Sequence, residues 1–195
     1  YVEKLSNNLI KIVYKIELGD KSKIKKITFV GDKIFKDRKL KNIIVSEEYK
    51  FWKFLSNRKF LNEEIESLDK RLLKNFYLNK GYYNVEINSS FAKMINDTEF
   101  ELIYNINSGN KVYFNELSIS YPRDFNEINY QKLNDLLVNL NGKPYSINSV
   151  EKILNQIDQI TINEEFKSIS ANIEEKIYED KIDVKFVIEE TESYL

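Results

Sequence analysis

The chain contains no cysteine and no histidine among its 195 residues. Without cysteine there can be no disulfide, no thiolate nucleophile and no cysteine-bound metal. Without histidine, the commonest general base and the commonest transition-metal ligand are also missing. An enzyme would have to work with Asp, Glu, Lys, Tyr or Ser alone. We therefore expect no enzyme, no catalytic residues, no metal site and no cofactor.

The sequence also lacks an excess of one charge and long apolar runs. The formal net charge is −1, so nothing favours wholesale binding to nucleic acid, and we expect no nucleic-acid partner. The apolar runs are far shorter than the roughly 20 residues that a transmembrane helix needs, and no signal peptide begins at Tyr1. With 42% hydrophobic and 31% charged residues, the composition is that of a soluble globular protein that can bury a core.

A helix-to-strand switch at Gly81 marks the first half of the chain. Asn62 can cap a helix whose apolar residues recur at steps of three or four, namely Ile65, Leu68, Leu72, Leu73 and Phe76. Gly81 fits a left-handed cap at the end of this helix, and alternation over residues 85–88 and 100–106 then predicts two half-buried strands. Upstream, residues 24–32 predict a strand, and a short helix carrying Leu40, Ile43 and Ile44 begins at Asp37. The predicted order is strand, helix, helix, strand, strand.

The same order recurs in the second half. Residues 114–119 repeat the spacing of the first strand, helices are predicted over 130–140 and up to residue 160, and strands over 169–173 and 182–188. The last of these helices begins near Ser146 to Asn148, where Glu151 can complete a capping box on Asn148. The repeat is clearest in the closing strands, because IKIVYKIELG at residues 10–19 matches FELIYNINSG at residues 100–109.

This repeat predicts the organisation of the chain. We expect the C-terminal strand or strands of a preceding unit in residues 1–20, followed by complete units in residues 21–110 and 111–195. Within a unit, layering two amphipathic helices on one face of the sheet buries both apolar surfaces at once. The linkers between units are very short, so neighbouring units should touch and hinge, with Ser108, Gly109 and Asn110 at the hinge.

Three motifs in the first complete unit resemble those of the POTRA family. They are Ile27-x-Phe29-x-Gly31-Asp32, Leu72-Leu73-x-x-Phe76-Tyr77-x-x-x-Gly81-Tyr82 and Ser108-Gly109. The chain resembles the third and fourth POTRA repeats of an outer-membrane protein assembly factor, with the tail of the second. The resemblance implies an α+β fold of tandem domains, each β-α-α-β-β. In each domain two helices pack on one face of a three-stranded mixed sheet, with the third strand central and the second at an edge.

The resemblance also implies a function. The chain would be a periplasmic, chaperone-like scaffold attached to an outer-membrane β-barrel, which the full protein carries as a C-terminal transmembrane domain. Its partners would be unfolded outer-membrane β-barrel proteins and accessory lipoproteins of the assembly complex. One alternative is a POTRA module of a related transporter, either a translocation assembly protein or a two-partner secretion pore. An enzyme with the same order of elements is the third possibility, and the missing histidine and phosphate-binding loop argue against it.

The second strand of each unit is the expected binding site. Natural sheet edges are usually protected by Lys, Pro, bulges or inward charges, whereas the outward positions Ser168, Ser170 and Asn172 are small and uncharged, and Glu86, Asn88 and Ser90 carry one charge. We expect a client strand to add here, at Val85, Glu86, Ile87, Asn88, Ser89, Ser168, Ile169, Ser170, Ala171 and Asn172. The alternative is an ordinary polar face covered by a neighbouring unit.

An aromatic cluster between the two helices of the first unit is a further candidate. Phe51, Trp52 and Phe54, with Phe60 nearby, could contact clients or a membrane surface through exposed rings. The alternative is that the rings fold back and pack over the helix pair. Because aromatic side chains are more often packed than exposed, we favour packing.

Overall fold

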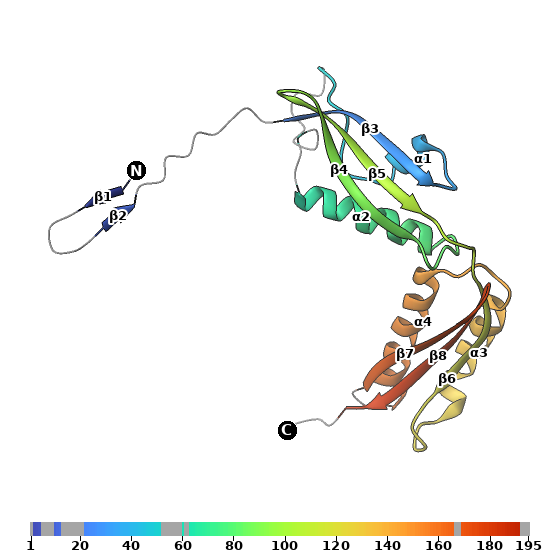
Figure 1. The fold of residues 1–195 in the computed structure, drawn as a ribbon. Coiled ribbons are helices and arrows are strands. Elements are labelled where there is room, and N and C mark those ends of the chain that lie inside the picture. The colour runs from blue at the N-terminus through green and yellow to red at the C-terminus, as the bar shows by residue number, and fades with distance from the viewer. Residues whose placement is uncertain are drawn as a thin grey trace.

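The computed structural model describes residues 2–4, 10–12, 22–51, 60, 63–165 and 169–191. Strand β1 (Val2–Lys4) pairs with β2 (Ile10–Ile12), and two larger units follow along the chain (Figure 1). The first unit consists of β3 (Lys23–Asp32), α1 (Asp37–Lys41), α2 (Glu63–Leu78), β4 (Glu86–Asn96) and β5 (Glu99–Asn107). The second unit consists of β6 (Tyr113–Ser120), η1 (Glu127–Tyr130), α3 (Gln131–Leu140), α4 (Ile147–Ile160), η2 (Thr161–Glu165), β7 (Ile169–Tyr178) and β8 (Lys181–Glu190).

Both units share one sheet topology. The strand orders are β3-β5-β4 and β6-β8-β7, so the last strand of each unit is central. The central strand runs parallel to the first strand and antiparallel to the second. The helices of each unit cover one face of its sheet (Figure 1). The predicted α+β class, with two helices on a three-stranded mixed sheet, is confirmed.

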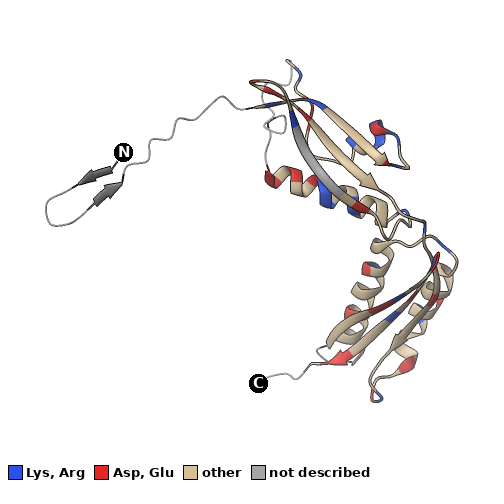
Figure 2. Ribbon diagram, viewed as in Figure 1, with Lys and Arg blue, Asp and Glu red and all other residues tan. Residues whose placement is uncertain are grey.

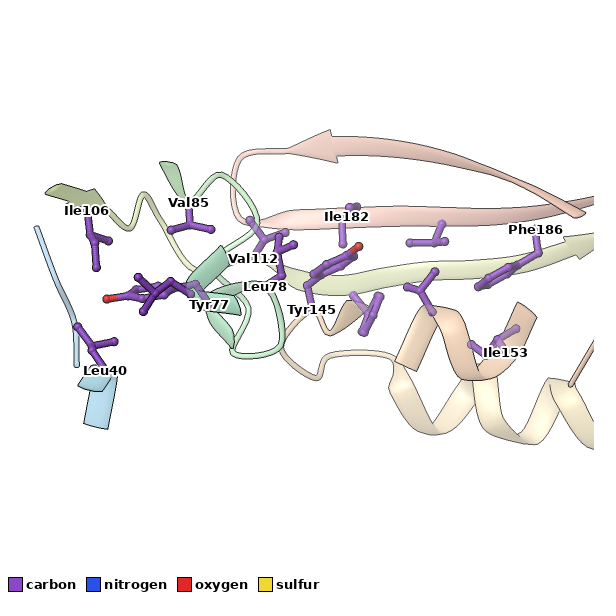
Figure 3. Packing of buried hydrophobic residues seen from close by; sticks show 14 of the residues in the cluster. Leu40, Tyr77, Leu78, Val85, Ile106, Val112, Tyr145, Ile153, Ile182 and Phe186 are labelled. Atoms are coloured by element: carbon purple, nitrogen blue, oxygen red, sulfur yellow. The ribbon is translucent and has the colours of Figure 1, made fainter. Parts of the chain in front are cut away.

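The cores of the two units meet where the units join. Alternate residues of the central strands are buried, as the period of two requires. Leu78, Val85 and Val112 lie between the core of the first unit and Tyr145 and Ile182 of the second (Figure 3). All five residues are buried. The apolar side chains therefore form one cluster that continues from unit to unit.

The residues of α2 that are fully buried are shifted by one position from those that the apolar pattern predicts. They are Asp69, Leu73 and Tyr77, whereas Leu68 and Leu72 are half-buried. Gly81, with φ +93°, then ends the helical segment in the left-handed conformation that the sequence predicts. A Cβ at Gly81 would lie 3.0 Å from a side-chain carbon of Lys111 in the linker, so a side chain here would be crowded as well as strained.

Two helix boundaries differ from the sequence prediction. Helix α1 ends at Lys41, so Ile43 and Ile44 follow the helix rather than belong to it. Helix α4 is capped by Ser146, whose extended backbone lets its hydroxyl accept a hydrogen bond from the Ser149 backbone N–H, so the predicted capping box on Asn148 is wrong.

The edge strands also differ from their predicted form. A register shift between Ile87 and Ser89 places a bulge in β4, so the alternation predicted through residues 86–90 is interrupted. Strand β7 continues to Tyr178, five residues beyond the predicted end, because the hairpin to β8 turns only at Glu179 and Asp180. Glu179 adopts φ 53°, an uncommon left-handed conformation that a tight turn uses.

Candidate functional site

In each of the two three-stranded sheets, the edge formed by the first strand is closed by another part of the chain. On β3, the backbone oxygen of Ile24 accepts from the N–H of Tyr49 at 2.7 Å, and the Glu48 carboxylate accepts from the N–H of Ile27 at 3.0 Å. On β6, the N–H of Phe114 donates to the backbone oxygen of Lys143 at 2.9 Å. Polar groups that would otherwise attract another strand are therefore already bonded there.

The other two edges, β4 and β7, are open. Among the described residues, β4 pairs only with β5 and β7 only with β8. No backbone hydrogen bond joins the outer side of either strand to the rest of the described chain. With 11 and 10 residues, both strands are long enough to receive an extended peptide along much of their length.

The predicted site residues of the first unit lie at the start of β4. Val85 is buried just before the strand, and Glu86 and Ile87 are its first two residues. Asn88 is the unpaired residue of the bulge, and Ser89 resumes pairing opposite Asn105. No feature of the sequence predicts this bulge.

In the second unit, the predicted residues cover only the first half of β7. Ile169, Ser170 and Ala171 are half-buried and Asn172 is exposed, while Ser168 lies outside the described residues. The sequence prediction missed the second half of the strand, where Ile173, Ile177 and Tyr178 are exposed. The sequence does indicate a longer strand, since the alternation of Ile169, Ala171 and Ile173 resumes at Ile177 after the single glutamate Glu175.

The aromatic cluster is described only in part. Phe51 has 77% of its surface exposed, and Phe60 is half-buried and bridges to Lys23 on β3. Trp52 and Phe54 lie outside the described residues. The choice between a contact surface and a packed cluster therefore stays a prediction.

The predicted hinge residues lie between the two units. Ser108 is fully buried, its N–H donates to the backbone oxygen of Asp32 at 3.2 Å, and its hydroxyl donates to the Asp32 carboxylate at 3.3 Å. Gly109 has φ +62°, and Asn110 is exposed. Rotation between the units at these residues stays a prediction.

Asn79 connects the end of α2 to the start of α4 in the other unit. Its amide oxygen accepts from the Ser146 hydroxyl and from the Asn148 backbone N–H, both at 2.9 Å. Its amide nitrogen donates to the backbone oxygen of Asn75 at 2.9 Å and to Oδ1 of Asn148 at 3.0 Å. One side chain thus satisfies terminal groups of two helices.

A glutamate on β7 forms a second connection, which we call the clasp, consisting of Tyr83, Tyr145 and Glu175. The Glu175 carboxylate accepts from the Tyr83 hydroxyl at 2.5 Å and from the Tyr145 hydroxyl at 3.1 Å. The two rings meet edge to face, with centroids 4.9 Å apart. Burial and the bond to Glu175 raise the pKa of Tyr83 to about 12, so its hydroxyl remains a donor at neutral pH. The sequence prediction missed this clasp.

No group of three or more Asp, Glu, Cys or His side chains in the described part of the chain could hold a metal ion. None of its helices is both long and apolar enough to cross a membrane.

Comparison with known proteins identifies related sequences. A model of the POTRA family, described as "Surface antigen variable number repeat", matches residues 22–109. The outer-membrane protein assembly factor BamA of Neisseria meningitidis is 28% identical over 157 residues, which is 80% of this chain and 19% of that protein. BamA of Buchnera aphidicola is 27% identical over 77% of this chain and 24% of that protein. The chain thus spans less than a quarter of the length of these curated relatives.

Solved structures agree on the fold. The crystal structure of Haemophilus influenzae BamA POTRA3-5 superposes with a TM-score of 0.67 at 19% identity, covering 87% of this chain and 66% of that one. POTRA1-2 of the periplasmic domain of Omp85 from Anabaena gives a TM-score of 0.53 at 6% identity, covering 89% of this chain and 99% of that one. The model of the POTRA family thus matches residues 22–109, and the chain as a whole is similar to the POTRA repeats of BamA.

Proposed function

We propose that this chain is a periplasmic module of the outer-membrane protein assembly machinery, which receives unfolded outer-membrane β-barrel proteins by β-strand addition at β4 and β7. The observation that carries the proposal is the difference between the sheet edges. Both first strands are closed by hydrogen bonds to other segments, and both second strands are open among the described residues. The similarity to BamA supports the assembly role, and accessory lipoproteins of that machinery would be further partners.

Strand addition of this kind suits transient handling of a client. About five added backbone hydrogen bonds, at roughly 1 kcal/mol net each, would barely offset the cost of association. Weak binding lets a client leave one edge and reach the next. A POTRA module of a related transporter remains the alternative function, with the same edges used for a different client.

The test is a titration of the whole chain with a ten-residue peptide of alternating apolar and polar residues, followed by amide NMR. We expect weak, saturable binding with shifts concentrated on residues 84–96 and 169–178. The matched control is the same peptide with every residue N-methylated, which cannot donate along either edge and should not bind. Shifts confined to Phe51 and its neighbours would instead favour the aromatic cluster. Equal binding of both peptides would contradict strand addition.

A further inference from the structure

A groove of 430 Å³ lies beside the start of β4. It is lined by Lys70, Arg71 and Lys74 of α2 and by Val85, Glu86 and Ile87 of the edge. Three cationic side chains thus stand next to an unpaired strand edge, with one carboxylate among them. A strand that extends the sheet at β4 would place alternate side chains over this groove.

Two of these cations are not used elsewhere in the described structure. Lys70 forms an ion pair with Glu66 at 3.1 Å, one helical turn earlier. Arg71 and Lys74 are exposed, and no ion pair joins either of them to another described residue. Figure 2 shows the basic residues of α2 beyond its acidic first turn. These two charges are therefore available to a ligand.

The second unit has no basic residues at the positions that correspond to Lys70, Arg71 and Lys74. Its helix α4 corresponds to α2, because the buried positions Asp69, Leu73 and Tyr77 match the buried Ile153, Ile157 and Thr161. In this alignment the three basic positions are replaced in turn by Leu154, Asn155 and Asp158. In this alignment Asp158 takes the place of Lys74, although β4 and β7 occupy the same position in their sheets.

We infer that the β4 edge selects peptide strands with acidic side chains at alternate positions, whereas the β7 edge does not. The inference rests on the proposed function, since it requires a strand to add at β4. The spacing supports it, because two residues of a strand advance by about 6.7 Å and four residues of a helix by about 6 Å. Acidic side chains at positions i and i+2 of the added strand would therefore lie near Lys70 and Lys74. Arg71 can bind a third carboxylate in bidentate fashion.

The test compares three ten-residue peptides that differ only at three alternate positions, which carry Glu, Gln or Lys. Affinity is measured by fluorescence anisotropy with the whole chain, and the site is located by amide NMR. Each exposed ion pair is worth roughly a twofold to fivefold change in affinity. We therefore expect the Glu peptide to bind the β4 edge about tenfold more tightly than the Gln peptide and the Lys peptide to bind more weakly. Added salt should remove the difference.

Two matched triple variants distinguish the effect of the charges in the groove from the effect of the net charge of the chain on peptide affinity. Lys70→Gln/Arg71→Gln/Lys74→Gln should abolish the preference, while Lys132→Gln/Lys143→Gln/Lys152→Gln, with the same change in net charge, should keep it. All six positions are at the surface, so both variants should remain folded, which circular dichroism checks. Asn155→Arg/Asp158→Lys should give the β7 edge a preference for the Glu peptide.

The outcomes also separate this inference from the proposed function. If the Glu and Gln peptides both shift the β4 amides with equal affinity, strand addition stands and charge selection is wrong. If neither peptide shifts those amides, both ideas fail for the first unit. An equal loss of preference in the two triple variants would also overturn the inference, because only net charge would then matter.

Discussion

At the scale of single residues, Asp69 stands out because it is a fully buried acid in the core of the first unit. Its carboxylate accepts from the backbone N–H of Val45 at 2.5 Å and from the Tyr104 hydroxyl at 2.6 Å. A further bond comes from the N–H of Ser46 at 3.3 Å. Burial and the bond to Asp69 raise the pKa of Tyr104, so this hydroxyl stays protonated and donates. Asp69 therefore fixes the segment after α1 to α2 and to the central strand.

We predict that Asp69→Ala destabilises the chain by about 3 kcal/mol, because it leaves several buried donors without an acceptor. Urea unfolding followed by circular dichroism measures this loss. The matched control is Asp135→Ala on the surface of α3, which should change stability by less than about 0.5 kcal/mol. Equal, small effects of both substitutions would contradict the role assigned to Asp69.

At the scale of elements, a helix of one unit depends on a residue of the other. Ser146 and Asn79 together satisfy the first turn of α4, and Asn79 belongs to the segment that follows α2. The Asn148 N–H lies in the first turn of α4 and donates to a side-chain oxygen, as in a helix cap, but the acceptor belongs to Asn79, far away in the sequence. The start of α4 is thus stabilised by contact between units.

We predict that Asn79→Ala loosens the first turn of α4 by about 1 kcal/mol, the usual cost of losing a cap. Hydrogen exchange at the amides of residues 148–150 should become roughly fivefold faster, while exchange in the middle of α2 stays unchanged. Asn75→Ala is the control, since only the backbone oxygen of Asn75 bonds to Asn79. Unchanged exchange at residues 148–150 in Asn79→Ala would show that the cap contributes nothing.

At the scale of the whole molecule, the clasp of Tyr83, Tyr145 and Glu175 joins the two units, in addition to the bonds of Asn79 and the shared core. Glu175 belongs to β7, so this contact joins an open edge of the second unit to the end of the first. Tyr145 is buried, and its ring also packs on Phe114 at 5.3 Å between centroids. Any rotation at Ser108, Gly109 and Asn110 has to break the bond between Tyr83 and Glu175.

We predict that Glu175→Ala frees the two units to reorient, because removing a charged acceptor weakens the clasp by about 1–3 kcal/mol. Residual dipolar couplings measure the alignment of each unit. The two alignments should agree in the native chain and differ in Glu175→Ala. Glu174→Ala is the control, since this neighbour forms only an exposed ion pair with Lys185 at 3.7 Å and should leave the alignment unchanged. If the two units already align independently in the native chain, the clasp does not fix their relative orientation.

The sequence alone determined the order of the elements, the repeat and the buried faces of the central strands. These depend on local periods of two and of three or four residues, which alternating side chains and caps such as Gly81 display directly. Most of the residues predicted to accept a strand lie on β4 and β7, the strands at the open edges, and strand addition there stays a prediction. The sequence did not show the bulge at Asn88, because register depends on the partner strand.

Only the tertiary structure decided which edges are closed, how the units join and where the charges gather. Tyr49 closes β3, Asn79 caps α4 and Glu175 binds Tyr83 through contacts between residues far apart in the sequence. No local period reports such contacts, because each depends on how complete elements pack. The basic groove beside β4 has the same origin, since Lys70 and Lys74 are ordinary surface residues of a helix until the fold places them beside Ile87.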